Sequence, residues 1–208
     1  MSLSPRDPAP PELRRLALAP RLRVHAPGTA GRAEVEDFIG DVFRARYGAD
    51  VRQFAPVLVG LHDTAGELVA AAGYRAADRG RLFLERYLDG PVESRLAAES
   101  SAAPSRSRIV EVGHLAAARA GEGRRLVLLL GPHLAAEGFR WVVSTLTEEL
   151  RQLFVRLGIA PMALGVADPL LLGDEAGRWG TYYDHRPVVL AGQIDQALKA
   201  LARRRTLA

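Results

Sequence analysis

An acidic residue lies in the middle of an apolar segment. Residues 108–116 read RIVEVGHLA, and Glu111 stands between Val110 and Val112. If the segment is a strand, side chains alternate between its two faces, and Glu111 points away from both valines. Burial raises the pKa of a carboxyl group toward the range of a general base. Glu111 is therefore a candidate catalytic proton acceptor, and an ion pair with a buried arginine is the structural alternative.

A histidine follows on the same segment, three residues after Glu111. Strict alternation puts His114 on the face of the valines, whereas a β-bulge near Gly113 would bring it round to the face of Glu111. A core or edge histidine is the structural interpretation. If the bulge is present, His114 becomes a candidate for binding substrate.

A glycine-rich turn comes next and precedes a predicted helix. Gly121 and Gly123 would let the backbone approach an anion without a Cβ clash, and the N–H groups of a helix N-terminus suit a phosphate. Arg124 and Arg125 would add charge-assisted hydrogen bonds. The turn is neither a Walker loop nor a Rossmann fingerprint, and an ordinary loop explains it equally well.

Charged residues also stand among large apolar ones in residues 82–93, LFLERYLDGPVE. Glu85 and Asp89 could form the rim of a site for an amine. An amphipathic helix with solvated charges is the alternative.

An aromatic cluster occupies residues 178–185, RWGTYYDH. Trp179 and Tyr183, beside small residues, suggest a pocket wall or lid, and a tyrosine there could donate a proton to a leaving thiolate. A packed aromatic corner is the alternative.

The elements that must position these residues follow from hydrophobic periodicity. Residues 1–20 are proline-rich and predict a flexible tail, and residues 21–208 predict one domain. Residues 82–89 fit either a helix or a strand, and 97–107 a mobile loop. We expect strands at 21–26, 56–62, 67–74, 108–116, 140–145, 162–166 and 188–191, and helices at 31–48, 124–137, 148–157 and 193–204. This order predicts an α/β (α+β) fold with one central sheet.

Composition excludes several classes of protein. The 208 residues contain no cysteine, which rules out disulfides, iron–sulfur clusters, thiolate zinc sites and a cysteine nucleophile. No apolar run is long enough to span a membrane and no signal peptide is evident, so we expect a cytoplasmic protein. The net charge of +4 fits a solvated surface or an acidic partner. No nucleic-acid-binding motif is present, and we expect no bound metal.

Several of these segments, in this order, resemble the thermostable hemolysin family of bacterial proteins. The resemblance rests on Phe54–Leu58, Ala70–Arg75 and residues 82–93, 109–117, 138–159 and 179–194. The family pattern is similar in turn to the GCN5-related N-acetyltransferase and acyl-homoserine lactone synthase superfamily. One departure is His114, where the commoner pattern has Asn.

The resemblance implies an acyl-CoA N-acyltransferase-like fold, with a mixed, mostly antiparallel sheet, helices on both faces and one splayed strand pair. An acyl thioester would lie between the splayed strands, with its pyrophosphate on the glycine-rich turn. Ala118 stands where the usual turn pattern has Gln or Arg, which favours acyl-carrier protein over coenzyme A as donor. Arg75 resembles a polar position facing the pocket, and His114 replaces the Arg that accompanies Glu111 in the lactone synthases.

The implied function is an N-acyltransferase that moves an acyl group from acyl-carrier protein or acyl-CoA to a small amine, with no covalently bound cofactor. Helix 148–157 lacks the tyrosine acid of many N-acetyltransferases, so Tyr182 or Tyr183 would have to substitute. Two alternatives stay open: a membrane-active protein acting through the basic helix 194–204, and a degenerate fold that only senses a ligand. Homo-oligomers are also compatible with the sequence.

Overall fold

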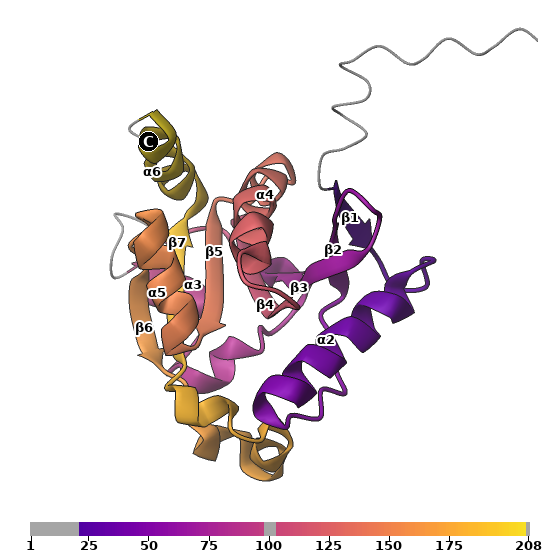
Figure 1. The fold of residues 1–208 in the computed structure, drawn as a ribbon. Coiled ribbons are helices and arrows are strands. Elements are labelled where there is room, and N and C mark those ends of the chain that lie inside the picture. Colours follow the sequence, from indigo (N-terminus) through magenta and orange to yellow (C-terminus); the bar gives the residue numbers. More distant parts are fainter. Residues whose placement is uncertain (1–20, 98–102, 207–208) are drawn as a thin grey trace, which may run out of the picture.

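The computed structural model describes residues 21–97 and 103–206, so the predicted tail and part of the predicted 97–107 loop lie outside the described residues (Figure 1). The strands are β1 (Arg21–His25), β2 (Val57–His62), β3 (Leu68–Ala76), β4 (Ile109–Ala117), β5 (Trp141–Leu146), β6 (Met162–Val166) and β7 (Val188–Gln193). The α-helices are α2 (Arg32–Tyr47), α3 (Val92–Ala97), α4 (Glu122–Ala136), α5 (Glu148–Leu157) and α6 (Ile194–Thr206). The expected strands and helices are therefore present.

The seven strands form one sheet in the order β1-β2-β3-β4-β5-β7-β6. Every neighbouring pair is antiparallel except β4 and β5, which are parallel. The predicted fold class, a mixed and mostly antiparallel sheet with helices, is confirmed.

Helices cover both faces of the sheet. One face carries α4, α5 and α6, and the other carries α2, α3 and short 3₁₀ turns (Figure 1). The alternation expected along β4 is observed from Ile109 to Val112. Val110 and Val112 pack with Leu126 and Leu130 of α4, whereas Ile109 packs in the cluster that contains α3. Glu111 therefore faces the α2 side.

A connection between β6 and β7 docks on the end of α2. The Asp50 amide donates to the Arg178 carbonyl (2.7 Å), and the Thr181 amide donates to the Tyr47 carbonyl (2.8 Å). Gly180 adopts φ +51, and a Cβ there would overlap the Tyr47 carbonyl oxygen. This contact places Trp179 over α2, where its ring meets Phe43 edge-on.

The segment 82–89, for which the sequence fitted either a helix or a strand, contains a 3₁₀ turn at Leu84–Tyr87, and a further 3₁₀ segment spans Pro169–Trp179. Helix α6 is present as expected, and its apolar side packs against the rest of the domain. Ile194 is buried and Leu198 packs against the cluster around α4. In the described part of the chain, no helix combines the length and apolar character needed to cross a bilayer.

Candidate active site

β4 and β5 run together for only three residues and then separate. Ile109–Glu111 pair with Trp141–Val143, after which β4 continues to Ala117 and β5 to Leu146 with no further pairing between them. Backbone N–H and C=O groups of β4 that face this wedge have no partner on β5. Because such groups need hydrogen-bond partners, they are available to a ligand lying along the strand.

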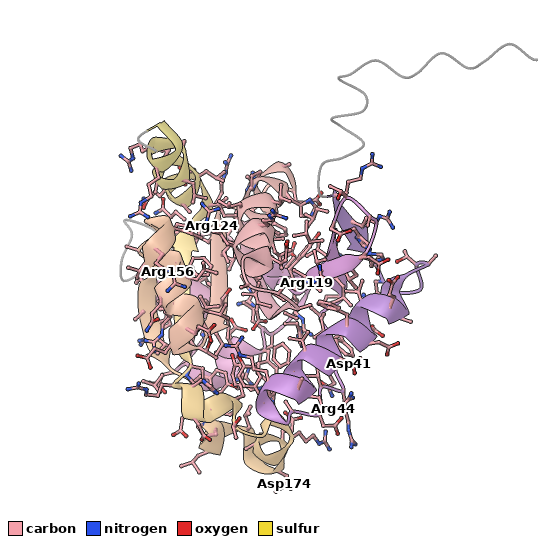
Figure 2. All side chains as sticks on the ribbon, in the orientation of Figure 1. Asp41, Arg44, Arg119, Arg124, Arg156 and Asp174 are labelled. Carbon is pink, nitrogen blue, oxygen red and sulfur yellow. The ribbon has the colours of Figure 1, made fainter. Side chains whose placement is uncertain are left out.

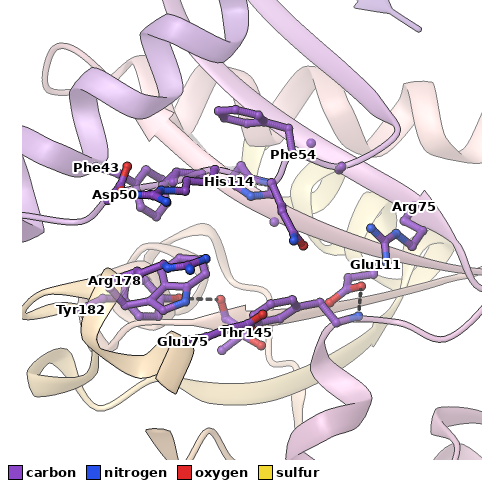
Figure 3. A pocket seen from close by; sticks show the side chains of 18 of the residues that line it. Phe43, Asp50, Phe54, Arg75, Glu111, His114, Thr145, Glu175, Arg178 and Tyr182 are labelled. Carbon is purple, nitrogen blue, oxygen red and sulfur yellow. Dashed lines mark hydrogen bonds and ion pairs between the residues drawn. The ribbon is translucent and has the colours of Figure 1, made fainter. Parts of the chain in front are cut away.

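A cavity opens on the α2 side of the wedge, with Glu111 in its wall (Figure 3). Strands, helix α2 and loops all contribute to the wall, and both polar groups and aromatic rings face the cavity. The lining comprises Phe43, Asp50, Val51, Arg52, Gln53, Phe54, Ala55, Gly73, Arg75, Phe83, Tyr87, Glu111, Val112, Gly113, His114, Thr145, Glu175, Arg178, Trp179, Tyr182 and Tyr183. Segments distant in sequence thus meet around one carboxylate.

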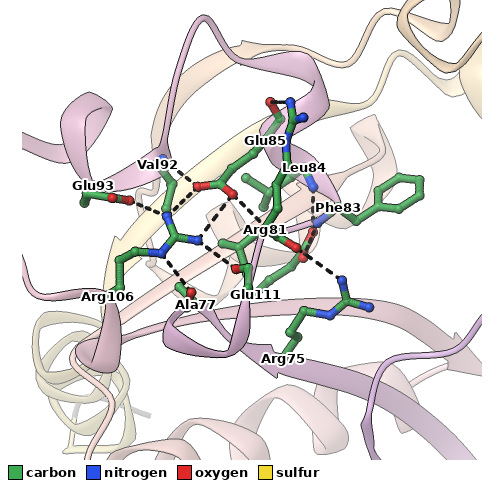
Figure 4. A network of polar contacts seen from close by, with 12 residues as sticks. Arg75, Ala77, Arg81, Phe83, Leu84, Glu85, Val92, Glu93, Arg106 and Glu111 are labelled. Carbon is green, nitrogen blue, oxygen red and sulfur yellow. Dashed lines mark hydrogen bonds and ion pairs between the residues drawn. The ribbon is translucent and has the colours of Figure 1, made fainter.

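The Glu111 carboxylate is held by backbone amides. The Phe83 amide donates to Oε2 and the Leu84 amide to Oε1, both at 2.8 Å (Figure 4). Burial raises the pKa of Glu111, and the two amides and the Arg75 charge offset part of that rise. Each oxygen keeps a lone pair beyond its one bond, so the group can still accept a proton.

His114 lies in the same cavity because β4 is bulged. The β3–β4 register passes from Gly73↔Gly113 to Ala71↔Ala116, and His114 has φ +52. Strict alternation is therefore wrong at His114, and the bulge considered in the sequence is present. Burial lowers the pKa of His114 to about 4, so the ring is neutral at neutral pH. Its buried Nδ1 has no hydrogen-bond partner among the described atoms.

Two tyrosines form a hydrogen-bonded pair on the opposite wall. The hydroxyl groups of Tyr87 and Tyr183 lie 2.5 Å apart. Burial raises the pKa of both phenols, so both remain protonated donors. The Trp179 ring lies edge-on to Tyr183 and 5.9 Å from Phe83. Trp179 and Tyr183 thus line the cavity together.

The structure places Glu85 and Asp89 away from the cavity lining. Glu85 is 4% exposed, and its carboxylate accepts from the amides of Leu82 and Val92. It also forms an ion pair with Arg106 at 2.7 Å (Figure 4). Asp89 is exposed. Glu85 therefore holds its own segment in place, and neither Glu85 nor Asp89 lines the cavity in which an amine would bind.

The predicted phosphate turn begins α4. Gly121 is the N-cap at φ +90, which only glycine adopts easily, and Gly123 lies in the first turn. Arg124 and Arg125 are exposed, and Arg125 pairs with Glu122 at 3.2 Å. The turn offers free N–H groups and positive charge, while Glu122 adds one opposing carboxylate. Across the described residues, no three His, Asp or Glu side chains gather in a way that would hold a metal.

A second, almost wholly apolar cavity lies on the other face of the wedge. Its lining includes Val112 of β4, Leu146 of β5 and Phe154 of α5, and α4 and α6 close it with Leu130 and Leu198. Val112 lines both cavities. The separation of β4 from β5 therefore puts a polar and an apolar cavity on either side of the same opening.

Sequence reasoning missed much of the cavity wall. Phe43 looks like a core residue of an amphipathic helix, and its spacing gives no sign of a cavity. Thr145 ends an expected strand with no motif around it, and Arg178 opens the aromatic cluster at 178–185 but was not singled out as a cavity residue. Tyr87 stands in the cluster at 82–93, but its partner Tyr183 lies far away in sequence. Only tertiary packing brings such residues together.

Comparison with solved structures identifies the fold as that of N-acyltransferases. The acyl-homoserine lactone synthase LasI matches with a TM-score of 0.58 and 14% identity, over 88% of this chain and 95% of LasI. FeeM, an N-acyl amino acid synthase from uncultured soil microbes, gives 0.58 and 13%, over 87% and 94%. BjaI, a CoA-dependent acyl-homoserine lactone synthase solved with SAM and isopentyl-CoA, gives 0.56 and 15%, over 89% of each chain.

Residues 25–198 match the sequence pattern of the thermostable hemolysin family. The chain belongs to that family, as the resemblance implied. Among curated proteins, none matches this chain.

Proposed function

We propose that this protein is an N-acyltransferase that moves an acyl group from an acyl thioester to an amine. The observation that carries the proposal is the parting of β4 and β5 directly beyond Glu111. This parting leaves unpaired backbone groups beside a carboxylate that is held by amides and lines a cavity. The similarity to lactone synthases and to an N-acyl amino acid synthase supports the same reaction class.

The donor fits along β4. Its phosphate would meet the free amides at Gly121 and Gly123 and the side chains of Arg124 and Arg125, where an α-helix N-terminus favours anions. From Ala117 back to Glu111 the strand spans roughly 20 Å. A pantetheine arm of either acyl-CoA or acyl-carrier protein can cover that length. The thioester would then reach Glu111 with its fatty chain entering the apolar cavity.

The reaction needs a base, a carbonyl-polarising donor and a proton for the leaving group. Glu111 takes a proton from the bound ammonium, and the freed amine attacks the thioester carbon. An unpaired β4 amide stabilises the tetrahedral oxygen. The C–N bond forms and the C–S bond breaks, and Tyr183 supplies a proton to the departing thiolate. The second proton that the attacking nitrogen loses restores the Tyr183 phenol, so that one proton ends on Glu111 and one on the thiol. His114 and Trp179 line the space in which the amine binds.

The absence of cysteine from the chain makes the assay simple, because a thiol reagent reports only thiol released from donor. Purified protein is given acyl-CoA or acyl-carrier protein with a panel of amines. Glu111→Gln is compared with Glu67→Gln, a matched change at an exposed hairpin turn. We expect turnover in the wild type and in Glu67→Gln, and a fall of about 100-fold or more in Glu111→Gln.

Thiol release in no combination would contradict the enzymatic proposal. Tight donor binding without turnover would instead identify a ligand sensor on the same fold. Acyl thioesters are made inside cells, so the proposal places the protein in the cytoplasm. Liposome flotation tests the membrane-active alternative, and the packing of Ile194 and Leu198 inside the fold predicts no flotation.

A further inference from the structure

Arg75 stands beside Glu111 without an ion-pair partner. The two residues are directly opposite in the β3–β4 register, and both line the cavity. The Arg75 guanidinium donates one hydrogen bond of 3.3 Å to the Arg81 carbonyl and forms no ion pair with any described residue (Figure 4). The Glu111 carboxylate likewise meets only backbone amides in the described chain. A cation and an anion thus face one cavity side by side, each with free bonding capacity.

The other charged groups around this cavity are either held in ion pairs or exposed to solvent. Arg52 pairs with Asp50 at 2.6 Å, and Glu175 pairs with Arg86 at 2.6 Å. Arg178 is exposed at the rim (Figure 3). The free charge within the cavity is therefore concentrated at Arg75 and Glu111.

The anion that Arg75 would bind does not belong to the donor. Donor phosphates are expected at the α4 N-terminus, beyond the far end of β4, roughly 20 Å from Glu111 along the strand. Arg75 lies instead at the closed end of the wedge, where β4 and β5 still pair. A guanidinium presents paired donors that match a carboxylate. The anionic group therefore belongs to the amine acceptor.

Spacing then limits what the acceptor can be. Directly opposite residues on antiparallel strands have Cα atoms about 4.5–5.5 Å apart, and side chains on one face diverge little. An ammonium at Glu111 and a carboxylate at Arg75 must therefore be close neighbours on one molecule. An α-amino acid carries these two groups on a single carbon.

Aromatic rings form part of the remaining wall. Trp179 contacts both Phe83 and Tyr183, all three line the cavity, and the Arg86 guanidinium stacks 4.2 Å from the Phe83 ring centroid. Rings of this kind favour a flat or apolar side group over a charged one.

We propose that the acceptor is an α-amino acid with an apolar or aromatic side chain, whose carboxylate binds Arg75 and whose amine binds Glu111. This inference rests on the proposed acyltransferase function. The products are an N-acyl amino acid and a free thiol. One N–H proton of the amine passes to Glu111, and one proton reaches the thiolate sulfur.

The test compares four acceptors with the wild-type protein: L-phenylalanine, L-phenylalaninamide, 2-phenylethylamine and glycine. The first has a carboxylate and a ring, the next two lack the carboxylate, and glycine lacks the ring. We expect kcat/KM for phenylalanine to exceed that of every other acceptor by at least about 10-fold, because a hydrogen-bonded charge pair or a buried ring is lost in each of them.

The variant Arg75→Met should lower kcat/KM for phenylalanine to the level of its amide, mainly through KM, and should lower kcat/KM for 2-phenylethylamine by a much smaller factor, because that amine has no carboxylate for Arg75 to bind. Arg75→Lys should restore part of the preference. The control Arg79→Met removes an exposed arginine from the 3₁₀ turn that follows β3 and should keep the full preference. Equal use of phenylalanine and its amide by the wild type would overturn the carboxylate assignment. Equal use of phenylalanine and glycine would overturn the side-chain assignment.

A binding measurement separates this inference from the proposed function. Phenylalanine should raise the Tm of the wild type and of Arg79→Met, but not that of Arg75→Met. If no acceptor is acylated and this shift is still seen, the acyltransferase proposal fails and the amino-acid site stands. If amines are acylated and phenylalanine gives no shift and no preference, the acceptor inference fails alone.

Discussion

The orientation and pKa of the Glu111 carboxyl group depend on three residues that are distant from it in the sequence. The amides of Phe83 and Leu84 fix both oxygens, and Arg75 lies opposite on β3. Burial raises the pKa of the carboxyl group, Arg75 lowers it and the Glu85 charge raises it. Because its pKa is raised, this carboxylate takes up a proton more readily than an exposed glutamate.

The pH dependence of kcat/KM should show the raised pKa of Glu111. Glu111 must be ionised to accept a proton, so activity should rise with pH through an ionisation above the usual glutamate value of about 4.3. Arg75→Met should move this limb to higher pH, because the positive charge that lowers the pKa of Glu111 is removed. Arg79→Met should not move it. His114, with a pKa of about 4, is already neutral in this range. A limb at the ordinary glutamate value, unmoved in Arg75→Met, would contradict the role of Glu111.

The segment from Leu82 to Val92 presents its amides to Glu111 because Arg106 holds it in place. Arg106 donates to the carbonyls of Ala77 and Gly80 and pairs with Glu85 and Glu93 (Figure 4). Arg106 lies just before β4 and was not singled out in the sequence, since a lone arginine in a polar stretch resembles any solvated charge. Glu85 was identified as a notable residue, but its burial next to Arg106 could not be predicted without the fold.

Arg106→Met should lower the free energy of unfolding by about 3 kcal/mol, because it leaves the buried Glu85 carboxylate without its cation. The double change Arg106→Met with Glu85→Met should recover much of that loss. Urea unfolding of the three variants measures both effects. An unchanged midpoint in Arg106→Met would show that the network contributes little.

The same network should respond to acid in a defined direction. Hydrogen bonds and the Arg106 charge lower the pKa of Glu85 in the folded protein despite its burial. Its contribution is therefore present above the unfolded value of about 4.3 and is lost as the pH falls through the folded value. In Arg106→Met, the free energy of unfolding should therefore fall less steeply as the pH is lowered than it does in the wild type. An equally steep fall in variant and wild type would contradict this role of the Glu85–Arg106 pair.

The connection that carries Trp179 depends on Gly180. A Cβ at that position would overlap the Tyr47 carbonyl oxygen, and the backbone conformation disfavours other residues. Gly180→Ala should cost about 1–3 kcal/mol and weaken acceptor binding by displacing the aromatic wall. Gly177→Ala, where an added Cβ meets no atom within 4 Å, is the matched control. Equal stability of the two variants would contradict the docking described for residues 178–181.

Exposed arginines stand on several parts of the surface. Arg119, Arg124 and Arg156 lie on the side of α4 and α5, whereas Arg44 lies beside Asp41 on α2 and pairs with it (Figure 2). A net charge of +4 alone could not show this distribution. An anionic donor approaching α4 would meet Arg119 and Arg124 there.

Hydrophobic periodicity was enough to predict the strands of the described chain, the helices α2, α4, α5 and α6, and one central sheet, but it did not predict α3. Alternation along β4 correctly separated Glu111 from its flanking valines. It failed at His114, because a bulge depends on the register with β3, and register is a property of two strands. The apolar cavity and the aromatic wall were likewise invisible, because their residues meet only after α2, α4 and the 178–185 segment have packed.

The parting of β4 and β5 is the feature on which the proposed chemistry depends, and a crystal structure with a thioether analogue of an acyl-CoA tests it most directly. The analogue should lie between the two strands, with its sulfur near Glu111 and Gly113, its diphosphate at Gly121 and its chain in the apolar cavity. β4 and β5 paired along their full length, or an analogue bound elsewhere, would contradict the proposal.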